Sequence, residues 1–191
     1  MSGSEDVPVS VPVPSRPALL EAPEQVTASV RVEGFPSAHL PVLFDGVFTR
    51  LFPALGQAGV QPVGAAFSLY ARVPADTVDI EVGIPVDRVL DGAVDLGEIA
   101  VPEGAGGDHG AERVSFPLVA RASALPGGRI ATAAHLGGYD GLGEAWQTFM
   151  GALESQGQRA AMPFWEVYTT EPTPDMDPAT LRTDLFTALG V

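Results

Sequence analysis

The sequence predicts an α+β protein in which the strands form one antiparallel sheet and two helices pack on one side of it. Two observations lead to this fold class. Apolar residues alternate with polar ones along several short stretches, as in strands, and recur every three or four positions along two others, as in helices. The order strand, helix, strand, strand also occurs twice. Because one helix covers only one face of a three-stranded unit, we expect the two units to join edge to edge into a single sheet of about six to eight strands.

The strand predictions rest on alternation. In residues 25–33 every second side chain is apolar, which predicts a strand with one buried and one exposed face. In residues 164–169 Glu166 shares its face with two aromatic residues, whereas Trp165 points to the opposite face, where we expect it to pack under a helix. The remaining predicted strands are residues 64–73, 77–86, 114–125, 129–136 and 181–189.

Two stretches have the apolar spacing of helices. The first runs from Leu40 to Ala58 and ends at Gly59. We expect Pro53 to kink or restart this helix, because proline has no N–H to bond to the carbonyl four residues earlier. The second helix begins at Leu142, and Gly157 is expected at its C-terminal cap. Its apolar stripe consists of Leu142, Trp146, Phe149, Met150 and Leu153.

The chain repeats itself at an offset of 98 residues, the distance along the chain from Ala54 to Ala152. Over residues 51–74 this offset gives 5 identities in 24 positions, where about two are expected by chance. We therefore predict a disordered, proline-rich tail (residues 1–24) followed by one domain (residues 25–191). The predicted parts of the domain are repeat one (25–88), an acidic, glycine-rich linker (89–112) and repeat two (113–191).

The composition limits the kinds of partner. The net charge is −14, from 24 acidic side chains and 10 basic ones, all of them arginine. This balance argues against nucleic acid and membrane surfaces as partners, and it favours a cationic partner. The absence of cysteine fits a cytoplasmic protein, and no apolar run approaches the roughly 18 residues of a membrane helix. The three histidines lack metal-ligand spacing, and the glycine-rich run 137–143 lacks the context of a phosphate loop, so we expect no metal and no cofactor.

The most unusual local chemistry is a carboxylate between two aromatic side chains on one strand face, with Glu166 beside Tyr168. Pairing of the two units about a pseudo-two-fold seam would place Ser68 and Tyr70 opposite these two residues, along a groove. Aromatic surroundings partly desolvate a carboxylate, which raises its pKa and favours a ligand cation. Two plainer interpretations are a solvated Glu166, and a cross-strand pair of Tyr70 and Tyr168 that only stabilises the sheet.

Two segments resemble a known family: GRIATAAHLGGYDGLGEAWQTFMGALESQG (residues 128–157) and PFWEVYTTEP (residues 163–172). They are similar to the GyrI-like small-molecule-binding domain, which is also the effector-binding half of multidrug-responsive transcription regulators. The resemblance extends over about residues 25–190 and implies a tandem pair of strand-helix-strand-strand (SHS2) units with a groove for lipophilic, often cationic aromatic ligands. It also implies that Glu166 and Tyr168 contact the ligand. The chain departs from the family at Gly138, where a proline is usual.

Together, the residues and the resemblance predict a binding protein for lipophilic aromatic small molecules, with cations favoured, that serves in multidrug or toxin sensing or sequestration. The sequence shows no helix-turn-helix segment, so we expect a stand-alone member of the family. A plainer interpretation of Trp146, Phe44 and Phe48 is that they belong to the core, because they lie in the apolar stripes of the two helices. The candidate ligand-binding residues are Phe44, Phe48, Ser68, Tyr70, Tyr139, Trp146, Glu166 and Tyr168.

Two other functions are left open. The resemblance also implies hydrolysis of strained, cyclopropane-bearing DNA-alkylating toxins, with Glu166 as the catalytic residue that acts on water. The repeat equivalent of Glu166 is Ser68, so Glu144 or Glu171 would have to supply a second acid. The third function is inhibition of a protein target by the acidic surface, for which the sequence identifies no residues.

Overall fold

The structure, a computed structural model, describes residues 17–102, 112–170, 173 and 175–190, and this part of the chain holds nine strands in one sheet and two α-helices. The strands are β1 (Ala18–Ala22), β2 (Gln25–Pro36), β3 (Phe67–Tyr70), β4 (Thr77–Pro85), β5 (Ala93–Pro102), β6 (Arg113–Leu125), β7 (Gly128–Leu136), β8 (Ala160–Tyr168) and β9 (Arg182–Leu189). The helices are α1 (Leu40–Ala58) and α2 (Leu142–Ser155). The predicted α+β class is confirmed.

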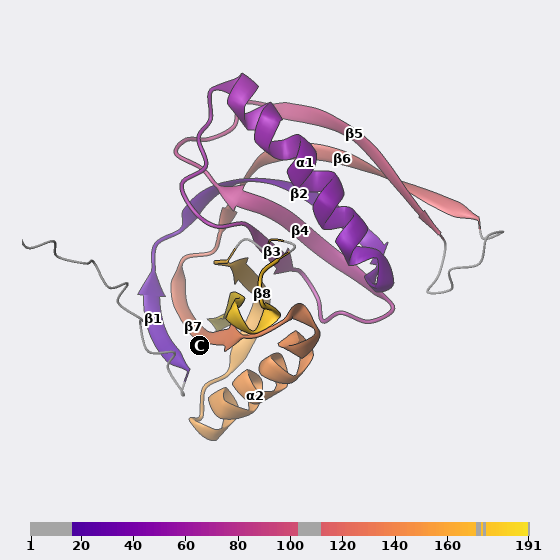
Figure 1. Ribbon diagram of the computed structural model, residues 1–191. Coiled ribbons are helices and arrows are strands. Elements are labelled where there is room, and N and C mark those ends of the chain that lie inside the picture. The colour runs from indigo at the N-terminus through magenta and orange to yellow at the C-terminus, as the bar shows by residue number, and fades with distance from the viewer. Residues whose placement is uncertain (1–16, 103–111, 171–172, 174, 191) are drawn as a thin grey trace, which may run out of the picture.

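The strand order is β1-β7-β9-β8-β3-β4-β2-β6-β5, and every neighbouring pair is antiparallel. In each half of the sheet the strand that precedes the helix lies outside, and the strand that follows the helix lies at the centre. The centre therefore falls between β3 and β8. Both helices lie on the same side of the sheet, with these two strands between them (Figure 1).

Helix α1 covers one half of the sheet. Its buried stripe consists of Leu43, Val47, Leu51 and Leu55, and these residues share a core with the facing side chains of β2 and β4. The helix is one continuous element through Pro53, so the expected restart is wrong. Burial of the stripe on both sides of Pro53 stabilises the helix enough to offset the missing hydrogen bond. The helix ends as predicted at Gly59, whose φ of 67° lies in the left-handed region.

Helix α2 covers the other half. Phe149 and Leu153 are buried against Ala131 of β7 and Leu185 of β9. Gly157 follows the helix with a φ of 69°, and its N–H donates to the carbonyl of Glu154, which is the conformation that favours glycine after a helix. None of the helices in the described ranges is long and apolar enough to cross a membrane.

The face of the sheet opposite the helices is also partly buried, which the alternation in residues 25–33 does not predict. Trp165 lies on this face, stacked on Phe186 with ring centroids 5.4 Å apart, and not under a helix as expected. The expectation was wrong because both helices cover the face that carries Glu166. Ser29 of β2 is buried on the opposite face too, since its cross-strand partner Gly83 has no side chain and lets the two backbones pack closely.

Two strands lie where the sequence predicts none. Strand β1 falls within the predicted tail and pairs with β7, and strand β5 falls within the predicted linker and pairs with β6. Both are edge strands of the sheet, and their pairing partners supply the order that prolines and glycines nearby obscure in the sequence. They account for the excess over the expected six to eight strands. The rest of the predicted tail (residues 1–16) and linker (residues 103–111) lies outside the described residues.

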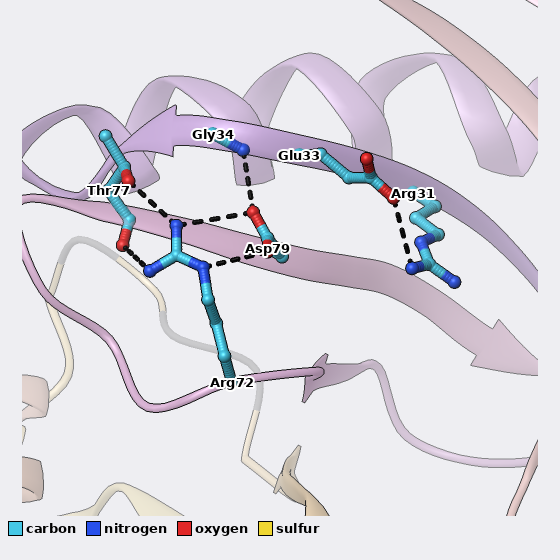
Figure 2. Close-up of polar contacts among 6 residues, drawn as sticks. All are labelled: Arg31, Glu33, Gly34, Arg72, Thr77 and Asp79. Atoms are coloured by element: carbon cyan, nitrogen blue, oxygen red, sulfur yellow. Dashed lines mark hydrogen bonds and ion pairs between the residues drawn. The ribbon is translucent and has the colours of Figure 1, made fainter.

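The turn between β3 and β4 is closed by polar contacts (Figure 2). Arg72 donates from Nε to Oδ2 of Asp79 (2.8 Å) and from its terminal nitrogens to the carbonyl oxygen and the hydroxyl of Thr77 (2.8 and 2.7 Å). The other oxygen of Asp79 accepts from the backbone N–H of Gly34 (2.8 Å), at an irregularity of β2 where φ is +64° and glycine is favoured. Hydrogen bonds from Arg72 hold the pKa of Asp79 below its usual value. These contacts fix how the end of β3 enters the sheet.

Candidate functional site

A cavity of about 1530 Å³ lies between the two helices, over the central strands. Its volume exceeds the 300–1,000 Å³ that is usual for small-molecule sites. Helix α1 contributes Phe44, Phe48 and Phe52 along one wall, and helix α2 contributes Trp146 and Met150 along the other. Side chains of β3 and β8 lie between these walls: Tyr70, Phe164, Glu166 and Tyr168. The predicted groove at the centre of the sheet is therefore a large, mainly apolar cavity with aromatic residues on both walls and on its floor.

Glu166 is buried in this cavity, with 5% of its surface exposed. Trp146 donates from Nε1 to Oε1 of Glu166 (2.7 Å), and the hydroxyl of Tyr168 donates to Oε2 (2.8 Å). The hydroxyl of Ser68 lies 3.5 Å from the same oxygen. Glu166 takes part in no ion pair with any residue that the structure describes. Neutral groups therefore hold a carboxylate that faces an apolar cavity.

The environment of Glu166 shifts several pKa values. Burial raises the pKa of Glu166 itself, as the sequence predicts, while the hydrogen bonds from Trp146, Tyr168 and Ser68 act in the opposite direction. Burial, followed by the negative charge of Glu166, raises the pKa values of Tyr70, Tyr139 and Tyr168. All three tyrosines therefore keep their hydroxyl protons at neutral pH. They are the only tyrosines in the chain.

The aromatic rings around Glu166 contact one another in two groups. The ring of Tyr168 meets those of Phe44 and Tyr139 edge to face, each at a centroid distance of 5.8 Å. On the other side, Tyr70 stacks on Phe164 with centroids 4.9 Å apart and an interplanar angle of 13°. Such pairs hold each ring in a defined orientation. The cavity thus presents both ring faces and ring edges to whatever enters it.

Local structure explains why these side chains converge. Alternation along β8 puts Glu166 and Tyr168 on the face that the helices flank, and Ser68 of β3 lies directly opposite Glu166 in the strand register. Tyr139 reaches the cavity from a short 3₁₀ helix, η2 (Tyr139–Gly141), which precedes α2. His135 Nε2 lies 3.0 Å from the carbonyl oxygen of Gly138, and this hydrogen bond stabilises the turn before η2.

Of the eight residues predicted from the sequence, seven line the cavity and one does not. Ser68 is fully buried behind Glu166 and Tyr168, so it contacts those side chains and not the cavity. The seven that line it are Phe44, Phe48, Tyr70, Tyr139, Trp146, Glu166 and Tyr168. Ligand binding by these seven residues is a prediction.

Sequence reasoning missed several lining residues. Phe52 could have been found, because it lies four residues after Phe48 on the same side of α1, and Phe164 could have been found from its place on the Glu166 face. Met150 could have been found in the same way, because it lies four residues after Trp146 on α2, whereas Asp45 and Met162 carry no such local signal. Within the described ranges, no group of three or more histidine, aspartate or glutamate side chains could hold a metal ion.

The chain is similar to a known domain family and to several solved structures. Residues 110–189 match the model of the GyrI-like small molecule binding domain. No curated protein sequence matches the chain. Among solved structures, the C-terminal domain of EcmrR is similar with a TM-score of 0.66 and 19% identity, over 92% of this chain and 97% of that domain. The EcmrR chain in a complex with DNA is similar over 91% of this chain, with a TM-score of 0.65 and 19% identity. The present chain spans only 57% of the length of that EcmrR chain.

Two more distant structures have the same fold. A hydrolase from Listeria innocua has a TM-score of 0.51 and 13% identity, over 92% of both chains. SAV2435 bound to tetraphenylphosphonium has a TM-score of 0.51 and 9% identity, over 92% of this chain and 94% of that one. At these identities the likeness shows the fold alone. The resemblance predicted from the sequence is confirmed: residues 110–189 match the GyrI-like small molecule binding domain, and the fold of the chain is that of the C-terminal domain of EcmrR.

Proposed function

We propose that this protein binds lipophilic aromatic cations in the cavity between α1 and α2, and that it serves to sense or sequester toxic compounds. One observation carries the proposal. Glu166 is buried at the cavity and bonded only to neutral donors among the described residues. A buried carboxylate without a positive partner is poorly compensated for its lost hydration, so a cation that enters the cavity gains a strong electrostatic partner.

The aromatic walls add to this attraction. A cation over the face of a tyrosine or tryptophan ring gains about 0.5–2 kcal/mol, depending on how far it is desolvated. Tyr168 and Trp146 both bond directly to Glu166, so a cation near the carboxylate also lies near their rings. Flat apolar groups bind by the area that they bury and need few hydrogen bonds. We therefore expect broad selectivity among aromatic cations.

The structural relatives support a ligand of this class. SAV2435, which has the same fold, is bound to tetraphenylphosphonium, a lipophilic aromatic cation. The identity of 9% is too low to transfer that ligand to this chain. The SAV2435 complex indicates that this fold is able to bind an aromatic cation. The specific proposal for this chain rests on the residues around Glu166.

Fluorescence titration tests the proposal. Trp146 lies in the cavity and Trp165 on the opposite face of the sheet, so a bound dye should quench the first more than the second. Cationic, neutral and anionic aromatic dyes of similar area are titrated at low salt into the native protein and into Glu166→Gln. We expect the variant to lose about tenfold in affinity for cations, or about 1.4 kcal/mol, and much less for neutral dyes. Equal losses for all three classes would refute the charge argument.

Hydrolysis of a strained, cyclopropane-bearing electrophile is the second proposal. It is favoured by the raised pKa of Glu166, because burial makes this carboxyl group a better proton acceptor than an exposed one and so suits it to general acid–base chemistry. A hydrolase from Listeria innocua also has this fold. The second acid would differ from those first considered, because Glu144 does not line the cavity and Glu171 lies outside the described residues. Among the described lining residues, the other carboxylate is Asp45.

Turnover distinguishes the two proposals. The native protein is incubated with a cyclopropane-bearing alkylating compound, and the ring-opened product is followed by chromatography. Hydrolysis requires product formation that disappears in Glu166→Gln while the circular dichroism spectrum is retained. Binding without product leaves only the first proposal. For the acidic-surface inhibitor, the described part of the structure identifies no particular residue.

A further inference from the structure

The cavity has a second carboxylate, which the proposed function does not use. Asp45 lies on α1 next to Phe44 and lines the cavity. It is exposed to solvent, whereas Glu166 is buried. One negative charge therefore lies deep in the cavity and another lies at its mouth. The inference below rests on the proposed function, because it concerns the ligands of the same cavity.

Of the charged side chains on α1, only the negative one, Asp45, lines the cavity. The helix has two charged side chains, Asp45 and Arg50. Arg50 points away from the cavity, with Nη1 3.5 Å from the carbonyl oxygens of Gly46 and of Glu98 on β5. Asp45 forms no ion pair with any described residue. None of the described residues that line the cavity is an arginine or a histidine. The cavity therefore offers two carboxylates and no competing cation.

Aromatic residues of the cavity lie near both carboxylates. Phe44, the chain neighbour of Asp45, contacts the ring of Tyr168, and the hydroxyl of Tyr168 bonds to Glu166. Both rings line the cavity, so a ligand that reaches both charges has aromatic surface to contact. The volume of about 1530 Å³ leaves room for it, since a single compact ligand usually fills 300–1,000 Å³. Phe52, Val73 and Met162 are exposed lining residues, and the exposed polar lining residues Gln147 and Thr169 carry no charge.

We propose that the cavity selects elongated aromatic dications, which place one positive charge on Glu166 and the second on Asp45 at the mouth. Glu166 recognises any aromatic cation, and Asp45 distinguishes a dication from a monocation of the same length. Because Asp45 is exposed, salt screens its contribution far more than that of the buried Glu166.

The test uses two matched probes. One has two quinolinium rings joined by an alkyl chain, and the other has one quinolinium ring and one neutral naphthalene ring on the same chain. Both are titrated into the native protein, Asp45→Asn, Glu166→Gln and the control Glu154→Gln. The control removes one negative charge from an exposed position on α2 that does not line the cavity.

Asp45→Asn is expected to weaken the two-charge probe about three- to fivefold, the upper part of the range for an exposed ion pair, and the one-charge probe less than twofold. The selective loss should vanish in about 0.5 M salt. Glu166→Gln should weaken both probes, and Glu154→Gln neither. Equal weakening of both probes by Asp45→Asn, no weakening at all, or the same losses in Glu154→Gln would overturn the role of Asp45. Failure of both probes to bind, or indifference of both to Glu166→Gln, would instead overturn the proposed function.

Discussion

Ser68 and Glu166 lie directly opposite each other on the two central strands, with Ser68 Oγ 3.5 Å from Glu166 Oε2. They are 98 positions apart, the offset at which the sequence resembles itself. Ser68 also lies 2.7 Å from the hydroxyl of Tyr168, which donates to the same carboxylate oxygen. Ser68 is fully buried and does not line the cavity. Ser68 therefore contacts the carboxylate of Glu166 from the side that faces away from the cavity.

Ser68→Ala tests this supporting role. Loss of a buried hydrogen-bonding group should cost about 1 kcal/mol of unfolding free energy, and it should raise the pKa of Glu166 further, because the hydroxyl lowers it. At high pH, on the plateau where cation affinity no longer changes with pH, the affinity of the two proteins should be the same. Titrations from acid pH up to this plateau measure both effects. A large affinity loss on the plateau would show that Ser68 contacts the ligand.

Cation affinity should depend on pH through Glu166. Its pKa is raised above the ordinary value of 4.5, so affinity for a permanently charged aromatic cation should fall as pH decreases through a midpoint above that value. The tyrosines stay neutral over this range, because their pKa values are raised as well. Glu166→Gln should remove the dependence. A dependence that persists in the variant would assign it to another group, and His135→Asn would test the nearest histidine.

The same shift has a consequence for stability. A carboxyl group with a raised pKa in the folded state contributes stability that is fully present below its unfolded pKa and is lost as pH rises through the folded pKa. The unfolding free energy of the native protein should therefore fall, relative to that of Glu166→Gln, as pH rises through this window. Urea unfolding of both proteins from pH 4 to pH 8 measures the difference.

Trp146→Phe keeps the aromatic wall but removes the N–H that donates to Glu166 Oε1. We expect a loss of about 1–3 kcal/mol of unfolding free energy, because a buried acceptor loses its donor. The midpoint for cation affinity should also move to higher pH, since this hydrogen bond lowers the pKa of Glu166. Trp165→Phe is the matched control. It lies on the opposite face, so it should cost stability without moving the midpoint.

Substitution by alanine should lower the unfolding free energy at Gly83 and raise it at Gly151. A Cβ at Gly83 would lie 2.4 Å from the carbonyl oxygen of Ala28 and 2.6 Å from Ser29 Cβ, so the substitution should destabilise the fold by about 1–3 kcal/mol. A Cβ at Gly151 meets nothing within 4 Å among the described residues. There alanine should stabilise α2 by about 0.5–1 kcal/mol, through its higher helix propensity. Urea unfolding of the two variants compares the effects, and a stable Gly83→Ala would contradict the close packing of β2 and β4.

Gly138→Pro introduces the proline that the resemblance to the GyrI-like domain implies at this position. Gly138 has a φ of −66°, which is the value that proline imposes. The Cβ would lie 2.5 Å from Asp140 Oδ1, but Asp140 is exposed and its side chain can rotate away. We therefore expect a gain of about 0.4–1 kcal/mol, because proline restricts the unfolded chain. A loss of stability in thermal unfolding would mean that the turn is strained by the ring.

Much of this site could be predicted from the sequence, because alternation along a strand decides which side chains share a face. Glu166 and Tyr168 share the cavity face for that reason, and the helical period places Phe44 and Phe48 on one side of α1. Local pattern could not identify Asp45, because a charged residue beside an apolar stripe is as consistent with a solvated helix edge as with a cavity wall.

The sequence by itself determined the order of the two helices and of seven of the nine described strands, the class of the fold and that Glu166 and Tyr168 share one face, since these follow from periods of two and 3.6 residues along the chain. Only the tertiary structure decided that Ser68 is buried, that Trp165 packs away from the helices and that β1 and β5 extend the sheet. Each of these depends on what lies across the sheet from a residue, and packing partners distant in sequence leave no periodic signal.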